Sequence, residues 1–486
     1  MPVHTPEWVK DAVFYQIFPD RFARSDGSPA RVNLEPWDSP PTARGFKGGN
    51  FAGIQAHLDH LVELGVNAIY LNPIFQSAAN HRYHTFDYHE VDPLLGGTDA
   101  FRTFLDAAHA HGIRVVLDGV FNHASRGIYQ FNHLLENGRQ SPYMNWFIVH
   151  GFPLHAFDEH VAPNYACWWN LRELPKLNTD DPEVRSFLMG VAERWLHEGI
   201  DGWRLDVPLE IRTPGFWEEF RERVKAISPD AYLLAEIWDE ATPWLQGEHF
   251  DAVMNYGFNR ACHGFFGGAW LDTSVRPGGF ELVQLDGAGF SRAVTRLLKL
   301  YDWDVTLAQF NLLSSHDEPR FLTMVRHDRR RLRLATLFQM AFPGPPSIYY
   351  GDEIGMEGGP DPDCRRAFPW DERGWDHELW ADFRRFVALR HAHPALRRGD
   401  FIELDVAPTT YAFARHDAGE AVVLAFNVGA SPAELALDCQ RLVPAGQIEP
   451  APVAVEAWTG REVGLTGGVL RTTVPALDAR VFVLGR

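Results

Sequence analysis

The stretch GWRLDVPLE, residues 202 to 210, determines how the rest of the chain is interpreted. It has the apolar, glycine-bounded character of a buried β-strand, yet Arg204 and Asp206 stand two positions apart within it. Burying an unpaired charge is costly, so a strand that served only as core would not carry these residues. Because strand side chains alternate with a period of two, both residues lie on one face, where we expect chemistry.

Length and composition indicate a soluble globular protein of two or three domains. The chain has 486 residues, of which 45% are hydrophobic and 22% charged, and its formal charge is -19. The acidic balance without a basic block disfavours a nucleic-acid partner, and a neutral ligand fits better. The 16 tryptophans offer flat faces that can stack on sugar rings, although core packing explains most of them.

The compartment is predicted to be the cytoplasm. The opening MPVHTPEWVKDAVFYQIFP lacks the pattern of a signal peptide, and no window approaches a membrane span, so we expect no membrane partner. The four cysteines are scattered without CxxC spacing, which argues against a zinc site or a disulfide framework.

Short β-branched or aromatic runs alternate with segments of helical periodicity such as residues 182–199, and eight such βα units predict an α/β fold, the TIM (β/α)8 barrel. The eight runs are AVFYQIFP from residue 12, AIYLNP from 68, IRVVLDGVF from 113, GWRLDV from 202, AYLLAEIW from 231, DAVMN from 251, FNLLSSHD from 310 and SIYYGDE from 347.

The spacing of these runs predicts three domains. Residues 1–123 and 179–399 form the catalytic barrel, and the aromatic-rich residues 124–178 form a small domain inserted after the third strand. After residue 399 the pattern changes to alternation, as in TTYAFARH and EAVVLAFNV, which predicts an antiparallel β-sandwich domain over residues 400–486.

Charged residues occur where several of the predicted strands end, and in a TIM barrel the carboxyl ends of the strands carry the chemistry. Each residue alone could be part of a structural ion pair, but six at equivalent positions favour a site. These residues are Asp118, Arg204, Asp206, Glu236, His316 and Asp317.

Two of the carboxyl groups suit glycoside hydrolysis. A retaining glycosidase needs an ionised nucleophile and a protonated acid roughly 5 Å apart. Arg204 beside Asp206 is expected to favour the ionised form of that carboxyl, whereas Trp238 and a neighbouring negative charge make Glu236 harder to ionise.

The remaining polar residues suit sugar binding. Asp317 would bind sugar hydroxyls or face the positive charge of an oxocarbenium-like transition state. His123 and His316 are expected to donate hydrogen bonds to sugar hydroxyls.

These motifs resemble the α-amylase family of glycoside hydrolases, and more narrowly its neopullulanase, cyclomaltodextrinase and maltogenic amylase branch. The resemblance covers nearly the whole chain. It is carried by DGVFNH (118–123), LPKLN (174–178), GWRLDVPLE (202–210), EIWD (236–239), LLSSHD (312–317) and GPPSIYYGDE (344–353), with support from VFYQIFPDRFA and from HRYHTFDYHEVDP at residue 81.

The resemblance implies roles for the individual residues. Asp206 would be the nucleophile, Glu236 the general acid and base, and Asp317 the stabiliser of the transition state. Arg204, His123 and His316 would contact the sugar whose bond is cleaved, and Asp118 would position Arg204. Tyr83 would stack on that sugar, and Trp238 would form a wall of the acceptor side. Asp361 and Arg365 would contact the next sugar on the donor side.

The chain departs from the branch at several points. Branch members carry an N-terminal domain of more than a hundred residues, whereas the barrel here begins within about a dozen residues of Met1, which leaves the oligomeric state open. His84 stands where the branch usually has Asp. Pro208 and Leu209 replace small or polar residues just beyond the nucleophile.

No cofactor is expected, and calcium is disfavoured. Many α-amylases bind calcium through an Asp and a His at the positions of Lys176 and Glu210. We hypothesise that an ion pair between these two residues, with Asn122 nearby, replaces that metal, since an ammonium supplies the positive charge that oxygen ligands require.

A second calcium site of the branch lies in the loop after the first strand. Arg24 occupies a ligand position there, which leaves Asp26, Asn50 and the Gly48 carbonyl. Hard cations prefer six or more oxygens. The sequence therefore argues against calcium at this loop as well.

The leading functional prediction is a retaining hydrolase of α-1,4-glucosidic bonds in maltooligosaccharides, cyclodextrins, pullulan or starch, with an α-glucan as its binding partner. A 4-α-glucanotransferase or an α-glucosidase would use the same residues, because water and a sugar hydroxyl compete for one covalent intermediate. A non-enzymatic glycan-binding homologue would be expected to lack a carboxylate, yet Asp206, Glu236 and Asp317 are all present.

Overall fold

The computed structural model describes residues 3–25, 33–442 and 453–485. The chain forms two compact units. The first comprises residues 1–7, 14–254 and 365–370, and the second comprises residues 8–13, 255–364 and 371–486.

Eight strands form one sheet in the order β8-β7-β6-β5-β2-β1-β10-β9, and the pairs whose registers are resolved are parallel. Seven strands fall within predicted runs, and β10 begins one residue before its run, so the TIM-barrel fold class is confirmed. The first unit supplies β1 (Phe14–Ile17), β2 (Ala68–Leu71), β5 (Arg114–Gly119), β6 (Gly202–Leu205), β7 (Tyr232–Ala235) and β8 (Ala252–Val253), and the second supplies β9 (Asn311–Leu312) and β10 (Pro346–Tyr349).

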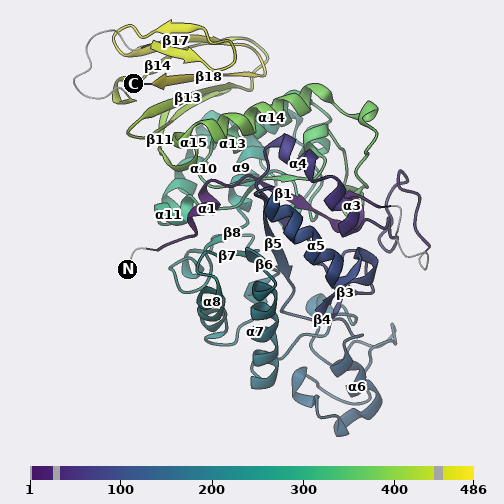
Figure 1. The fold of residues 1–486 in the computed structure, drawn as a ribbon. Helices are drawn as coiled ribbons and strands as arrows, with labels where there is room; N and C mark the ends of the chain where they lie inside the picture. Colours follow the sequence, from purple (N-terminus) through teal and green to yellow (C-terminus); the bar gives the residue numbers. More distant parts are fainter. Residues whose placement is uncertain (1–2, 26–32, 443–452, 486) are drawn as a thin grey trace. The chain divides into compact units, whose positions relative to one another are not determined.

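Helices separate the strands of the first unit, and α5, α7 and α8 run alongside the strands β5 to β8 (Figure 1). Their ends follow local rules: Asp181 accepts hydrogen bonds from the backbone amides of Glu183 and Val184 and so caps α7, whose first residue is Pro182. The helices of this unit are α2 (Pro19–Phe22), α3 (Phe51–Ala56), α4 (Leu58–Leu64), α5 (Gly97–Ala110), α6 (Tyr129–Asn137), α7 (Pro182–His197) and α8 (Phe216–Ile227), and α1 (Glu7–Lys10) precedes β1.

Two small substructures extend the first unit beyond its barrel strands. The strands β3 (Phe75–Ser77) and β4 (Thr85–Val91) form an antiparallel pair in the connection after β2. Residues 124–178 contain α6 and a set of isolated β-bridges, which join His123 to Lys176 and Cys167 to Pro175. The predicted boundaries at residues 123, 178 and 399 stay predictions.

The second unit ends in two packed antiparallel sheets. One has the order β11-β12-β13-β18-β15-β16 and the other pairs β14 with β17, and a buried apolar cluster with members from both sheets lies between them. The strands are β11 (Asp400–Ala407), β12 (Thr410–His416), β13 (Glu420–Asn427), β14 (Ala433–Asp438), β15 (Val453–Glu456), β16 (Glu462–Gly464), β17 (Val469–Val474) and β18 (Asp478–Gly485). The predicted C-terminal antiparallel β domain is confirmed.

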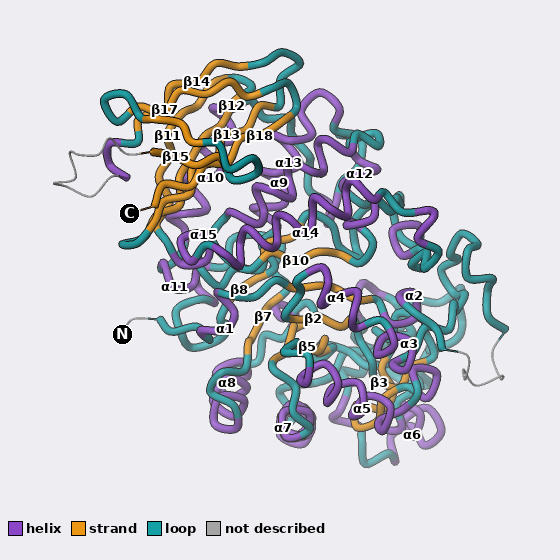
Figure 2. The backbone as a smooth tube through the Cα atoms, turned by 45° about the horizontal axis from the view of Figure 1, so that its top comes forward, coloured by secondary structure: helices purple, strands orange, loops and turns teal. Residues whose placement is uncertain are grey.

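Three helices of the second unit, α10, α13 and α15, pack against the larger of these sheets, and Figure 2 shows α10 and α13 next to its strands. Among the described residues, no helix combines the length and the apolar character needed to cross a membrane. The helices are α9 (Tyr256–Gly267), α10 (Gly287–Leu300), α11 (Trp303–Thr306), α12 (Phe321–Met324), α13 (Arg329–Ala341), α14 (His377–Ala392) and α15 (Pro394–Arg398).

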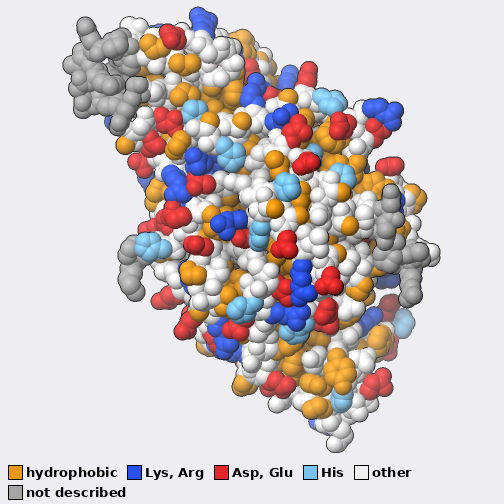
Figure 3. Space-filling model, viewed as in Figure 1, with side chains coloured by type: hydrophobic (Ala, Val, Ile, Leu, Met, Phe, Trp, Pro, Cys, Tyr) orange, Lys and Arg blue, Asp and Glu red, His pale blue; other side chains and the backbone are white. Residues whose placement is uncertain are grey.

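Acidic and basic side chains are interspersed over the face of the molecule shown in Figure 3. This mixture agrees with a chain that has an acidic balance but no basic block.

Candidate active site

A single buried guanidinium connects three carboxylates at the carboxyl ends of the barrel strands. Nη1 of Arg204 lies 2.8 Å from Oδ1 of Asp118 and 2.8 Å from Oδ1 of Asp206, and Nη2 lies 3.0 Å from Oε1 of Glu236. All four side chains are buried. The two acids predicted to act on the substrate therefore face the same cation.

Strand register brings this group together. Asp118 on β5 and Arg204 on β6 are direct neighbours across the parallel pair. A Cβ on Gly202 would lie 2.3 Å from the carbonyl oxygen of Tyr232, so only glycine allows β6 and β7 to approach this closely. Glu236 follows β7 directly, and its amide donates to the carbonyl of Leu205.

Glu236 is held by two further donors. The amide of Val207 donates to its Oε2 at 3.1 Å, and the indole of Trp238 donates to its Oε1 at 3.3 Å. Val207 has φ 35° and ψ 52°, a left-handed conformation that is strained for a β-branched residue. This conformation, directly after Asp206, aims the Val207 amide at the neighbouring acid.

The protonation of the cluster differs from the prediction. Burial raises the pKa of Asp206 well above its ordinary value, and the nearby negative charges of Glu236 and Asp118 raise it further. The Arg204 guanidinium lowers this pKa but does not offset the rise. Burial also raises the pKa of Asp118, against the opposing effect of Arg204. With one cation beside three carboxylates, both shifts favour the neutral form of Asp118 and Asp206.

Arg204 therefore does not give Asp206 and Glu236 the two different electrostatic environments that the sequence predicts. Arg204 contacts Glu236 as well as Asp206, and so it does not by itself distinguish the nucleophile from the acid. The sequence predicts the cation beside Asp206 only, because side-chain alternation within one strand can be recognised in the sequence. The contact of Arg204 with a side chain on a neighbouring strand cannot be recognised in this way.

Aromatic hydroxyls position Asp118 from the opposite side. The hydroxyls of Tyr70 and Tyr83 donate to its Oδ2 at 2.6 and 2.8 Å, and Asn72 donates to the Tyr83 oxygen at 3.1 Å. Sequence reasoning identified Tyr83 but missed Tyr70 and Asn72. Their two-residue spacing at the end of the second predicted strand was a signal that could have found them.

His123 lies beyond the carboxyl end of β5. Its backbone carbonyl accepts a hydrogen bond from the Tyr88 hydroxyl at 2.8 Å, and its ring stacks on Trp168 with centroids 5.3 Å apart. Burial lowers the pKa of His123 to about 3, so its imidazole is neutral near pH 7. A neutral imidazole can both donate and accept a hydrogen bond. His84, the departure from the branch, contacts His81 edge to face.

The second unit contains the other predicted site residues except Arg365. His316 Nε2 lies 3.3 Å from Asp317 Oδ2, and the Asp317 amide donates to Ser315 Oγ at 3.2 Å. Asp361 also belongs to this unit. Arg365 belongs to the first unit, where its guanidinium lies 5.5 Å from the ring of Phe18.

The hypothesised ion pair at the inserted segment is confirmed. Lys176 Nζ lies 2.9 Å from Oε2 of Glu210 and 3.2 Å from its backbone carbonyl oxygen. Asn122 lies close by, because its carbonyl accepts from the amide of Leu177. An ammonium therefore occupies this position, and the residues present do not fit a calcium ion.

The second calcium position also fits poorly. The Asn50 side-chain oxygen caps α3 by accepting from Gly53 at 2.8 Å, and it accepts from the Ser25 hydroxyl at 3.1 Å. Arg24 is exposed, and Asp26 lies outside the described residues. Within the parts of the chain that the structure describes, no three His, Cys, Asp or Glu side chains are grouped to hold a metal.

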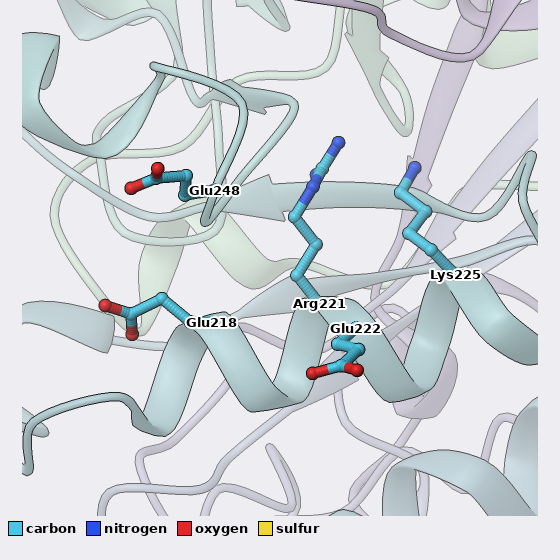
Figure 4. Close-up of a pocket in the computed structure, with 5 residues that line it drawn as sticks. All are labelled: Glu218, Arg221, Glu222, Lys225 and Glu248. Atoms are coloured by element: carbon cyan, nitrogen blue, oxygen red, sulfur yellow. The ribbon is translucent and has the colours of Figure 1, made fainter.

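A surface pocket on the first unit is separate from the carboxylate cluster. Figure 4 shows its lining by Glu218, Arg221, Glu222 and Lys225 of α8 together with Glu248. Arg221 and Lys225 both bind Asp251, which lies at the amino end of β8. Because Asp206 and Glu236 lie at the carboxyl ends of their strands, the pocket belongs to the other end of the barrel.

Glycoside hydrolases act through a pair of carboxyl groups, and here two buried carboxyl groups lie at neighbouring strand ends, where TIM-barrel enzymes carry their chemistry. Residues 16–384 match the family described as alpha amylase, catalytic domain. The chain belongs to the α-amylase family.

Three relatives place it within that family. A cyclomaltodextrinase of Geobacillus thermopakistaniensis (strain MAS1) is 43% identical over 88% of this chain and 71% of its own. The structure of an acarbose-soaked debranching enzyme of Nostoc punctiforme has 44% identity and a TM-score of 0.87, covering 100% of both chains. A cyclic α-maltosyl-(1→6)-maltose hydrolase of Arthrobacter globiformis, in complex with that sugar, has 36% identity and a TM-score of 0.86 over 99% of this chain and 100% of its own. The protein is thus a glycosidase related to the cyclomaltodextrinases and neopullulanases, as predicted.

Glu318, next to Asp317, gives the second unit a pH-dependent stability. It is buried, and it accepts a hydrogen bond from Asn259 Nδ2 at 3.0 Å. Burial, with the Asp317 charge nearby, raises the pKa of Glu318 from 4.5 to about 8. The folded state therefore binds a proton that the unfolded state releases above pH 4.5, and this stability is lost as the pH rises through about 8.

We expect Glu318→Gln, which imitates the protonated acid, to remove this loss. Between about pH 5 and pH 8 the wild type should lose a few kcal/mol of unfolding free energy relative to the variant. Denaturant unfolding at both pH values measures the difference, with the exposed Glu462→Gln as a control that keeps the wild-type profile. Identical pH profiles for the wild type and Glu318→Gln would contradict this prediction.

Proposed function

We propose that the protein is a retaining hydrolase of α-1,4-glucosidic bonds in short α-glucans, among them maltooligosaccharides, cyclodextrins and pullulan, with starch as a further substrate. The contact of one guanidinium with both Asp206 and Glu236 is the observation that carries the proposal. Both carboxyl groups lie within 3.0 Å of that guanidinium, which supports a nucleophile and an acid that act on the same bond.

In the first step, a carboxylate oxygen of Asp206 attacks the anomeric carbon while Glu236 protonates the departing glycosidic oxygen. The glycosyl ester on Asp206 is then hydrolysed by a water whose proton Glu236 takes back. As Asp206 gives up its charge to the ester, Arg204 remains paired with Asp118.

We assign roles to the other predicted residues from the resemblance to the family. Asp317 stabilises the oxocarbenium-like transition state, and His123 and His316 bind hydroxyls of the cleaved sugar. Tyr83 stacks on that sugar with its hydroxyl fixed to Asp118. The outer contacts are assigned to Trp238 on the acceptor side and to Asp361 and Arg365 on the donor side.

Cleavage of α-1,6 bonds is a second candidate activity. Two structural matches that span the full length are named as a debranching enzyme and as a hydrolase of a cyclic sugar with a (1→6) linkage. The same two carboxyl groups would serve both linkages, since only the position of the leaving oxygen differs. A 4-α-glucanotransferase and an α-glucosidase remain alternatives on the same site, and the cytoplasmic location stays a prediction.

The ion pair between Lys176 and Glu210 is proposed to take the place of a structural calcium. The ammonium supplies positive charge to the carbonyl and carboxylate oxygens of Glu210 that a cation would otherwise neutralise.

The two acids are tested by separate substitutions. Asp206→Asn should lower kcat on every substrate by at least about 10⁴-fold, because no covalent intermediate can form. Glu236→Gln should abolish cleavage of maltotriose yet release dinitrophenol from dinitrophenyl maltoside in a burst, because that leaving group needs no proton. Stopped-flow absorbance records the burst. Parental rates for either variant on maltotriose would overturn the assignment.

A substrate panel tests the specificity. Wild-type protein should hydrolyse β-cyclodextrin, pullulan and maltotriose faster than soluble starch, with glucose and maltose as the smallest products. The products are separated by chromatography at low and high maltotriose, where longer oligosaccharides at high concentration reveal transfer. Activity on starch alone would indicate a general α-amylase, and panose left intact from pullulan would exclude the α-1,6 activity.

Metal removal tests the ion pair. Chelation with EDTA should leave the melting temperature unchanged, whereas Lys176→Met should lower the unfolding free energy by about 1 kcal/mol or less, since the pair is half-exposed. Lys299→Met, in which a lysine outside this pair is replaced, serves as the matched control. A rise in melting temperature on adding calcium to the wild type would contradict the proposal.

A further inference from the structure

Two stacked tryptophans extend from His123 to the protein surface. The Trp168 ring stacks on the His123 ring, and the Trp169 ring stacks on Trp168 with centroids 4.4 Å apart and planes at 9°. Trp169 is nevertheless 78% exposed, the highest value among the exposed large hydrophobic residues in the parts of the chain that the structure describes. One face of its indole is covered by Trp168, and the rest of the ring meets solvent.

The backbone holds Trp169 in this exposed position. The segment is the tip of a hairpin whose arms are joined by the bridge between Cys167 and Pro175 and by the hydrogen bond from the Trp168 amide to the Leu174 carbonyl. Trp169 and Asn170 at the tip both have positive φ, 49° and 59°. Left-handed conformations are unfavourable for such residues and persist where the surrounding structure enforces them, often at binding sites.

The hairpin adjoins residues that are assigned to bind the cleaved sugar. The His123 ring interacts with the backbone of Tyr83, the residue assigned to stack on the cleaved sugar. Glu173, at the end of the same tip, interacts electrostatically with His84. The exposed Trp169 ring is therefore connected, through Trp168 and His123, to the residues proposed to bind the reacting sugar.

We propose that the outer face of Trp169 is a carbohydrate-binding subsite that stacks on a glucose unit of the bound glucan, beyond the sugars at the cleaved bond. This inference rests on the proposed function. A glucan is the occupant that fits, because the platform is a single flat ring joined to a sugar site, and the apolar face of a pyranose matches an indole in size. Trp168 acts as the rigid support that keeps Trp169 from turning inward.

The ratio of activities on long and short substrates tests the platform. Maltohexaose reaches several subsites, whereas nitrophenyl maltoside fills only those near the cleaved bond. In Trp169→Ala the ratio of kcat/KM for maltohexaose to that for nitrophenyl maltoside should fall about ten-fold, mainly through KM, because the lost stacking affects binding. Trp169→Phe should recover most of the ratio.

Tyr129→Ala is the matched control, because Tyr129 is a 65%-exposed aromatic of the same segment that contacts His133 and Tyr143 rather than His123. It should leave the ratio unchanged. A Trp169→Ala variant that loses both activities equally, or neither, would overturn the subsite.

Equilibrium binding separates this proposal from the proposed function. In the Asp206→Asn background, calorimetry should show that Trp169→Ala weakens maltohexaose binding about ten-fold. Equal affinity with and without Trp169 would reject the platform even if the wild type is an active hydrolase. Failure of the wild type to cleave any α-glucan would instead reject the proposed function, and the binding measurement would still decide the platform.

Discussion

The structure of the candidate site depends on one buried cation. Arg204 is fully buried and contacts Asp118, Asp206 and Glu236 from three neighbouring strands. Such a cluster is held only if the charges compensate one another, because a buried charge without a partner is strongly destabilising. The barrel strands therefore have to keep their register at this end for the acids to remain buried. The interaction that shapes the chemistry is also one that constrains the fold.

A buried proton follows from the same arrangement. Three carboxylates share one guanidinium in a region with little water, so full ionisation would leave a net negative charge in a medium that cannot screen it. A retaining mechanism starts from one ionised and one protonated acid. The raised pKa of Asp206 instead favours its neutral form, so the proposed mechanism needs this proton to pass from Asp206 to Glu236 before the attack. The substrate and its leaving oxygen then decide which acid keeps the proton, since Arg204 contacts both Asp206 and Glu236.

Much of the fold and part of the site could be predicted from the sequence, because both follow local rules. All eight barrel strands were visible as short apolar runs, and Asp118, Arg204, Asp206 and Glu236 were visible because charge at the end of such a run is unusual. The left-handed Val207 could not be predicted, because its conformation is imposed by the turn after β6 rather than by its own preference for extended backbone. The contact between Arg204 and Glu236 was also missed, since it depends on side-chain reach across strands.

The candidate acids lie at strand ends, whereas the exposed Trp169 lies on a loop, and loops vary in sequence more freely than strand ends do. The strand ends hold Asp206 and Glu236 within hydrogen-bonding distance of Arg204, so the proposed chemistry tolerates few changes of residue there. The hairpin that carries Trp168 and Trp169 is fixed by a few backbone bridges, and a loop of this kind can change in sequence without disturbing Arg204. Lys176 lies on the returning arm of the same hairpin and anchors it to Glu210 after β6. The ion pair therefore links the hairpin that carries the exposed indole to the segment after β6, the strand that carries Arg204. Under the proposed function, a change in this anchor would alter substrate preference before it altered the acids.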